Sequence, residues 1–135
     1  MAERLNAGDL CTRSIAFAHR NMAVDEAARM MREQHVGSLV VVDETPDGRV
    51  VVGMLTDRDI VTAIVAKVVD PSVVRVGDAM STDVVTARAD DSIVDVLGAM
   101  RRKGVRRIPV VDAKGALLGL VALDDVLELV AQELD

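Results

Sequence analysis

The pattern of apolar positions in the second half of the chain predicts alternating strands and helices. Residues 84–86 form a short strand signal, and the polar residues 90–92 offer side chains that cap a helix. Apolar residues then recur on one face at helical spacing, up to a cationic last turn and Gly104, which together indicate the end of a helix. The sequence therefore predicts a strand and then a helix that begins near Ile93.

Two further strands and a last helix complete this half. The β-branched run 108–111 and the apolar run 116–121 flank the turn-like residues 112–115, which favours two strands joined by a turn. Asp124 and Asp125 lead a final helix, whose residues predicted to face inward are Val126, Leu127, Val130 and Leu134. The order in this half is strand, helix, strand, strand, helix.

The first half has the same order. A helix begins at Asn21 or Asp25, with Val24, Ala27, Ala28 and Met31 on one face. Strands are predicted over residues 39–42 and 49–55, around a turn at residues 45–48, and a helix runs from Asp57 to about Val68. The apolar pattern thus predicts the same supersecondary unit twice.

The residues themselves repeat. Residues 76–80 match residues 7–11, and residues 119–126 match residues 53–60 after a small length difference in one loop. A half of about 65 residues buries too little surface to be stable alone. We therefore predict an α+β fold in which two β-α-β-β-α repeats pack face to face with pseudo-two-fold symmetry. The predicted boundaries are 7–68 for the first repeat, 69–75 for the linker and 76–135 for the second repeat.

Composition excludes several function classes. The 135 residues are 50% apolar but contain one Phe and no Trp or Tyr, so aromatic stacking on nucleobases is essentially absent. The net charge of −6 argues against binding to a phosphate backbone, and we expect no nucleic-acid partner. One cysteine excludes an intrachain disulfide. No signal-peptide pattern and no apolar run of the ~18 residues needed for a membrane helix occurs, so the expectation is a soluble cytoplasmic protein with no membrane partner.

Two short motifs identify a family. The string 53–59, Gly-Met-Leu-Thr-Asp-Arg-Asp, and the string 106–110, Arg-Arg-Ile-Pro-Val, stand at the ends of predicted strands within the duplicated frame. Together they closely resemble a tandem pair of cystathionine-β-synthase (CBS) domains of the stand-alone bacterial type. The resemblance covers nearly the whole chain, from about Gly8 to about Leu134. It implies a small-molecule-sensing module that binds an adenosine-containing ligand in the cleft between the repeats.

Thr56 and Asp59 are the candidate ribose-binding residues. A hydroxyl that ends a strand and a carboxylate three residues later converge on one point, where the carboxylate can accept from both hydroxyls of a ribose. The nearby helix N-terminus favours anionic groups. The same pair is also explained if Thr56 caps the helix and Asp59 complements its dipole. Both interpretations stay open at this point.

The second repeat differs at these positions and carries a different pair of polar residues. It has Ala122 where the first has Thr56, and it has Arg106 and Arg107 where the first has Gly and Ser at residues 37 and 38. In the family, a nucleotide site combines the ribose motif of one repeat with basic residues of the other. The resemblance therefore implies that Arg106 and Arg107 bind the phosphate through their guanidinium forks. The alternative is that both arginines are surface charges at a strand end.

The opposite half-site lacks these groups and is predicted to be degenerate, with Arg58 and Asp125 as its remaining polar residues. Arg58 is also explained as a solvent-facing charge. The base is expected to lie in an apolar pocket, although the same residues are also explained as core; its candidates are Ile15, Ala16, Met54 and Pro109. Asp124 departs from the basic residue that some family members place near the phosphate, and this favours a monophosphate.

The residues favour binding over catalysis. Cys11, His19 and His35 show no metal-ligand spacing, and no phosphate loop, nucleophile elbow or acid–base carboxylate pair is present in the sequence. We therefore expect no metal, no cofactor and no enzyme activity. The predicted function is a regulatory sensor that binds AMP, or otherwise ADP, ATP or S-adenosylmethionine, and signals to an unknown protein effector. The alternative is a structural dimerisation module with a vestigial site.

Self-association is predicted from the broad apolar stripes of the helices. These stripes are wider than one cleft needs, which favours a homodimer, although packing within the chain explains part of the pattern. Their residues are Ile60, Val61, Ile64, Val65 and Val68 in the first repeat and Val126, Leu127, Leu129 and Val130 in the second.

Overall fold

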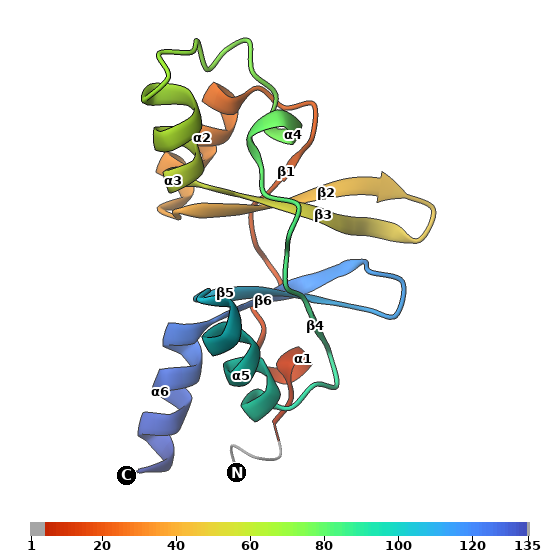
Figure 1. Cartoon of the computed structure of the whole chain (residues 1–135). Coiled ribbons are helices and arrows are strands. Elements are labelled where there is room, and N and C mark those ends of the chain that lie inside the picture. The colour runs from red at the N-terminus through yellow and green to blue at the C-terminus, as the bar shows by residue number, and fades with distance from the viewer. Residues whose placement is uncertain (1–4, 135) are drawn as a thin grey trace. The chain divides into compact units, whose positions relative to one another are not determined.

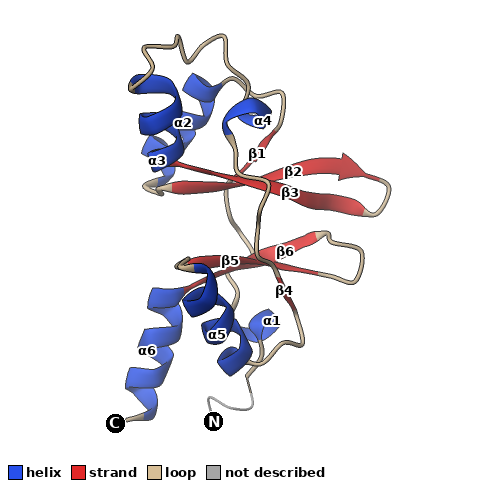
Figure 2. Cartoon of the chain, viewed as in Figure 1, coloured by secondary structure: helices blue, strands red, loops and turns tan. Residues whose placement is uncertain are grey.

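The computed structural model describes residues 5–134, which form two compact units (Figure 1). The central unit consists of residues 16–84, and the terminal unit consists of residues 5–15 together with residues 85–134. Each unit contains a three-stranded sheet and helices (Figure 2). The predicted α+β class is therefore confirmed.

The central unit has the predicted order of elements. Strand β2 lies between β1, to which it is parallel, and β3, to which it is antiparallel. The helices lie on one face of this sheet (Figure 1). The elements are β1 (Phe17–His19), α2 (Val24–Gln34), β2 (Ser38–Thr45), β3 (Gly48–Thr56), α3 (Asp57–Ile60), the π-helical turn η2 (Val61–Val65) and α4 (Val76–Ala79).

The terminal unit repeats this topology. Strand β5 lies between β4, which is parallel to it, and β6, which is antiparallel to it. The elements are α1 (Ala7–Leu10), β4 (Ala87–Arg88), α5 (Ile93–Lys103), β5 (Arg107–Val111), β6 (Leu117–Ala122) and α6 (Leu123–Glu133). The strand predicted over residues 84–86 is wrong, because only Ala87 and Arg88 come opposite β5, at Val110 and Val111.

The segment that begins each sequence repeat packs against the other repeat. Helix α1 begins the first repeat but belongs to the terminal unit, and α4 begins the second repeat but belongs to the central unit. In the terminal unit, the N–H groups of Ala7 and Gly8 donate to the carbonyls of Asp91 and Ala89 at 2.9 and 2.8 Å. In the central unit, the N–H of Gly77 donates to the carbonyl of Arg20 at 2.9 Å. The compact units and the sequence repeats therefore divide the chain at different residues.

Gly119 and Gly53, the equivalent glycines of the two repeats, allow this close packing. Thr12 exchanges two backbone hydrogen bonds with Leu120, of 2.9 and 3.0 Å, next to Gly119. A Cβ atom at Gly119 would lie 2.7 Å from both the Sγ of Cys11 and the carbonyl oxygen of Thr12. Gly53 has the same role in the central unit, where a Cβ would collide with Met80 and the carbonyl of residue 81. A side chain at either position would force the docked segment away from the strand.

Each unit has its own apolar core beneath its helices. The core of the terminal unit is formed by Ala7, Ala87, Ile93, Val96, Met100, Ile108, Val110, Val121 and Val126. That of the central unit is formed by Ala18, Ala27, Met31, Leu39, Val41, Leu55 and Val76. Ala7 and Val76, the first helical residues of α1 and α4, are fully buried in these cores, so the docked segments are part of each unit's packing.

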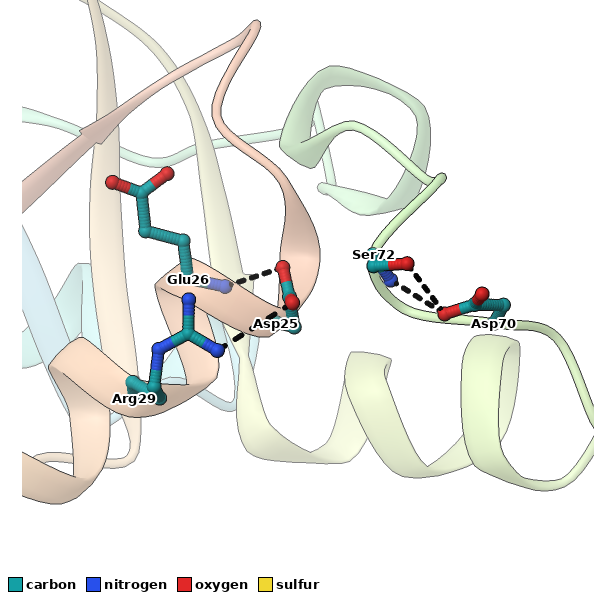
Figure 3. Close-up of polar contacts among 5 residues, drawn as sticks. All are labelled: Asp25, Glu26, Arg29, Asp70 and Ser72. Carbon is teal, nitrogen blue, oxygen red and sulfur yellow. Dashed lines mark hydrogen bonds and ion pairs between the residues drawn. The ribbon is translucent and has the colours of Figure 1, made fainter.

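Carbonyl groups near the linker accept hydrogen bonds from the first N–H groups of α2. Ala23 precedes this helix without a side-chain cap, and the N–H groups of Val24 and Asp25 donate to the carbonyls of Val74 and Pro71 at 2.9 and 3.2 Å. The observed start at Val24 lies between the two predicted starts. The linker turn itself is closed by Asp70, whose carboxylate accepts from the N–H and hydroxyl of residue 72 (Figure 3). Backbone carbonyls thus accept from these N–H groups in place of a side-chain cap.

The last helix is less buried than predicted. Of the residues expected to face inward, Val126 is fully buried, whereas Leu127 and Val130 in α6 and Leu134 just after it are exposed. The core contacts of α6 come from Val126 and Leu123, in its first turns. Leu127 and Val130 are therefore left at the surface of the terminal unit.

Candidate functional site

The two motifs identified in the sequence lie on neighbouring strand ends within each unit. In the central unit, Ser38 lies opposite Thr56, and the N–H of Asp57 donates to the carbonyl of Gly37 at 2.9 Å. Strand β3 passes directly into α3 at this point. The fold thus places the positions of the basic pair beside the positions of the ribose motif.

The terminal unit has the same geometry with different side chains. Arg107 lies opposite Ala122, and the N–H of Leu123 donates to the carbonyl of Arg106 at 2.8 Å. Strand β6 passes directly into α6 here. The equivalent strand ends therefore present two hydroxyls in the central unit and a guanidinium beside a methyl group in the terminal unit.

Thr56 and Asp59 form a capping box at the start of α3. The Asp59 N–H donates to the Thr56 hydroxyl oxygen at 3.1 Å, and the Thr56 N–H donates to Oδ2 of Asp59 at 2.9 Å. The capping role proposed for Thr56 is thus present. Oδ1 of Asp59 has no hydrogen-bond or ion-pair partner among residues 5–134. One carboxylate oxygen therefore remains available after the helix has been capped.

The start of α6 lacks this arrangement. Ala122 makes no side-chain cap, and the first turn of the helix carries two carboxylates, Asp124 and Asp125. Asp125 is half-buried, and Asp124 is exposed. Because Ala122 has no hydroxyl, this junction cannot offer a ligand the hydroxyl that Thr56 offers.

Arg106 and Arg107 line a cavity of about 320 Å³ in the terminal unit. Its other lining residues are Ala122, Leu123 and Asp124, so the cavity lies at the β6–α6 junction. A guanidinium nitrogen of Arg106 lies 3.7 Å from a carboxylate oxygen of Asp124, and both side chains are more than two-thirds exposed. Arg107 has no ion pair within the described part of the chain.

Arg58 occupies the second residue of α3, the position that Asp124 occupies in α6. Its N–H donates to Oδ1 of Asp57 at 2.8 Å, and its side chain is exposed. The helix starts of the two units therefore carry opposite charges at equivalent positions.

The four residues expected around the base are divided between the units. Ile15 and Pro109 belong to the terminal unit, whereas Ala16 and Met54 belong to the central unit. The backbone of Met54 exchanges two hydrogen bonds of 2.9 Å with Ser81. Pro109 lies opposite Leu120 in the β5–β6 pair.

Two polar side chains in the central unit have surroundings that the sequence did not predict. Oγ of Ser38 is buried and has no hydrogen-bond partner, and it belongs to the residue directly opposite Thr56. Nε2 of His19 is also buried without a hydrogen bond, 3.6 Å from a carboxylate oxygen of Glu44. The strand register that brings Ser38 to Thr56 is the only signal that could have identified it. Within residues 5–134, no three His, Cys, Asp or Glu side chains are grouped as metal ligands.

Both repeats of the chain are similar to known proteins. The family model for the CBS domain matches residues 7–66 and again residues 76–132. The CBS domain-containing protein YhcV of Bacillus subtilis is 36% identical over 118 residues, which cover 87% of this chain and 80% of that protein. The uncharacterized protein MK0525 of Methanopyrus kandleri is 32% identical over 125 residues, and the chain spans 62% of its length.

Three solved structures share the fold and contain adenosine compounds. The cytosolic domain of the Mg²⁺ channel MgtE in complex with ATP is 32% identical, with a TM-score of 0.78 over 95% of this chain and 50% of that one. The CBS domain pair of MJ0100, in complex with 5′-methylthioadenosine and S-adenosyl-L-methionine, is 25% identical, with a TM-score of 0.79 over 95% and 97%. CBSX2 in complex with AMP is 25% identical, with a TM-score of 0.81 over 97% and 99%.

No helix between residues 5 and 134 is both long and apolar enough to cross a bilayer.

Proposed function

Because this chain belongs to the CBS domain family and carries two CBS domains in tandem, we propose that it is a non-enzymatic regulatory module that binds an adenosine-containing ligand. The observation that carries this proposal is the similarity, over at least nine-tenths of the chain, to three structures that contain ATP, AMP or S-adenosylmethionine. The favoured ligand is AMP, followed by ADP, ATP and S-adenosylmethionine. A ligand of this kind regulates only if it binds two conformations of the protein with different affinities.

Thr56 and Asp59 are the proposed ribose contacts. The free Oδ1 atom of Asp59 can accept a hydrogen bond from a ribose hydroxyl without breaking the capping box. The unpartnered hydroxyl of Ser38, opposite Thr56, adds a further polar group at this strand end. The capping box thus supports binding by fixing the direction of the Asp59 carboxylate.

Arg106 and Arg107 are the proposed phosphate contacts. Both line the same cavity, and Arg107 has no ion pair among the described residues that would compete with a phosphate. A guanidinium group binds phosphate oxygens through paired N–H donors, which suits this role. Ile15, Ala16, Met54 and Pro109 remain the proposed contacts of the base, and Arg58 and Asp125 the polar residues of a weaker second site.

A structural interaction module is the second candidate. Thr56 and Asp59 already have a local role in capping α3, which is what a vestigial motif would retain. Apolar residues of η2 and α6 are exposed, and they favour a homodimer. The two candidates differ in one measurable property, which is the affinity for adenosine compounds.

Thermal unfolding with AMP, ADP, ATP and S-adenosylmethionine tests the proposal. A ligand at about 100 times its Kd stabilises the folded state by about 2.7 kcal/mol, which raises the Tm of a domain of this size by several degrees. If none of the four compounds raises the Tm of the wild-type protein, the sensor function is wrong and the structural module is favoured.

Two variants then test the assignment of residues. Asp59→Asn keeps an oxygen for the capping box but removes the charge, and Arg107→Ala removes a proposed phosphate contact. Both should weaken binding, whereas Arg101→Ala, an exposed cation in the last turn of α5, should not. A double-mutant cycle measures whether Asp59 and Arg107 act on one ligand, because residues that contact the same ligand show non-additive losses. Loss of binding in Asp125→Ala alone would contradict this choice of residues.

A further inference from the structure

The cavity of the terminal unit contains a carboxylate among its cationic groups. Arg106, Arg107 and Asp124 are its only charged lining residues within the described part of the chain. Asp124 lies 3.7 Å from Arg106, whereas Arg107 has no such partner. One of the two positive charges is therefore partly neutralised before any ligand binds.

The position of Asp124 is fixed by the fold. It is the second residue of α6, and the N–H of the residue before it donates to the carbonyl of Arg106. The equivalent position of α3 carries Arg58, so the fold accepts a cation there. No hydrogen bond within residues 5–134 requires a carboxylate at Asp124, which has the ion pair with Arg106 as its one polar contact.

We propose that Asp124 sets the phosphate selectivity of this cavity, so that a nucleoside monophosphate binds more tightly than a diphosphate or triphosphate. This inference rests on the proposed function, in which Arg106 and Arg107 contact the ligand's phosphate. A single phosphate can bind Arg107 and those N–H groups of Arg106 that do not face Asp124, so the pair between Arg106 and Asp124 is kept. Each further phosphate brings another negative charge near Asp124 and has to compete with it for Arg106.

The size of the effect follows from electrostatics at a partly exposed site. Like charges separated by a few ångströms repel each other there with enough energy to change an affinity by about tenfold. The repulsion between exposed charges is screened by salt, with a Debye length of about 10 Å at 0.1 M. The preference for AMP over ATP should therefore be largest at low ionic strength.

The test is calorimetric titration of the full chain with AMP, ADP and ATP, without divalent cations, at low and at high salt. The wild-type protein should bind AMP most tightly and ATP most weakly. In Asp124→Asn the ratio of the ATP Kd to the AMP Kd should fall by about tenfold at low salt. Asp124→Arg, which gives α6 the charge found in α3, should lower the ratio further.

A matched control removes the same charge elsewhere in the terminal unit. Asp95 is an exposed carboxylate in the first turn of α5 and does not line the cavity. Asp95→Asn should leave the ratio unchanged, and circular dichroism checks that each variant is folded. If AMP and ATP bind but Asp124→Asn changes the ratio no more than Asp95→Asn, the selectivity role is wrong while the proposed function stands. If no variant binds any of the three nucleotides, the proposed function is wrong and the selectivity role with it.

Discussion

Thr56 and Asp59 exchange two hydrogen bonds across the junction between β3 and α3, with each backbone N–H donating to the other residue's side chain at 2.9 and 3.1 Å. The last residue of a strand is thereby joined to the first turn of the helix that follows. The pair therefore has a structural role in the absence of ligand, and a change to it should alter stability as well as the proposed binding.

Replacement of Thr56 in the absence of ligand measures the structural effect by itself. Thr56→Ala removes the hydroxyl that accepts from the Asp59 N–H, and we expect a loss of about 1 kcal/mol of stability. Thr56→Ser keeps the acceptor and should have a Tm close to that of the wild type. The measurement is thermal unfolding of the three proteins without ligand. Equal melting temperatures for Thr56→Ala and Thr56→Ser would show that the capping bond contributes nothing.

Replacement of two glycines by alanine is predicted to change the stability of the protein in opposite directions. A Cβ at Gly119 would lie 2.7 Å from the carbonyl oxygen of Thr12, so Gly119→Ala should destabilise the protein by about 1–3 kcal/mol through steric overlap. Gly98 lies inside α5, where an added Cβ would meet only the flexible end of Arg102, at 3.0 Å. Gly98→Ala should therefore stabilise the helix by about 0.5–1 kcal/mol.

Denaturant unfolding of the two variants measures both effects. The same substitution raises stability at one site and lowers it at the other, so a general effect of adding a methyl group is excluded. A stable Gly119→Ala protein would mean that the segment containing Thr12 is not held against β6 in solution.

The helices with strong local signals were predictable from sequence. For α5, Ser92 caps the first turn by accepting from the Asp95 N–H at 3.0 Å, and Gly104 ends the helix with a φ of 66°. Both features depend on residues within a few positions of each other. The start of α2 was not predictable in this way, because its N–H groups are satisfied by linker carbonyls about 50 residues later in the sequence.

In the candidate site, too, the local features could be predicted from sequence and the features that depend on strand pairing could not. The spacing of Thr56 and Asp59 is local, so their convergence at the β3–α3 junction could be predicted. The ion pair between Arg106 and Asp124 depends on the β5–β6 register, which the sequence does not specify residue by residue. The same holds for Ser38, whose place opposite Thr56 is set by the β2–β3 register.

Asp112 gives the terminal unit a pH-dependent contribution to stability. Its carboxylate accepts from the N–H groups of Ala116 and Lys114, at 3.0 and 2.9 Å, and these bonds lower the pKa of the group below its ordinary value. Because the folded pKa is the lower one, the stabilisation is present above the unfolded pKa of about 3.9. It is lost as the pH falls through the folded pKa.

Comparison of Asp112→Asn with the wild type across pH isolates this contribution. The amide removes the titration, so the wild type should be the more stable protein at pH 7. The difference in Tm should shrink progressively below about pH 5. Thermal unfolding between pH 7 and pH 2.5 measures it, together with an NMR titration of the Asp112 carboxyl. A difference in Tm that stays constant across this range would contradict the assigned role.

Self-association is expected to depend on the apolar residues that the fold leaves exposed. Val65 in η2 and Leu127 in α6 are 64% and 54% exposed, although the sequence pattern assigns both to apolar stripes. A surface of this kind costs free energy in water and is stabilised by burial against a second copy. In a symmetric homodimer, each substitution occurs twice in the interface. Val65→Glu and Leu127→Glu should therefore shift the protein strongly towards the monomer.

Light scattering after size-exclusion chromatography measures this shift. The wild-type protein should have twice the mass of one chain, and each glutamate variant should approach the mass of one chain as the protein is diluted. Val73→Glu is the matched control, because Val73 is 70% exposed but lies in the linker, outside both helices. Dissociation in the control to the same extent would show that added charge, rather than loss of a specific contact, causes the effect. A wild-type protein that is monomeric at all concentrations would exclude the homodimer.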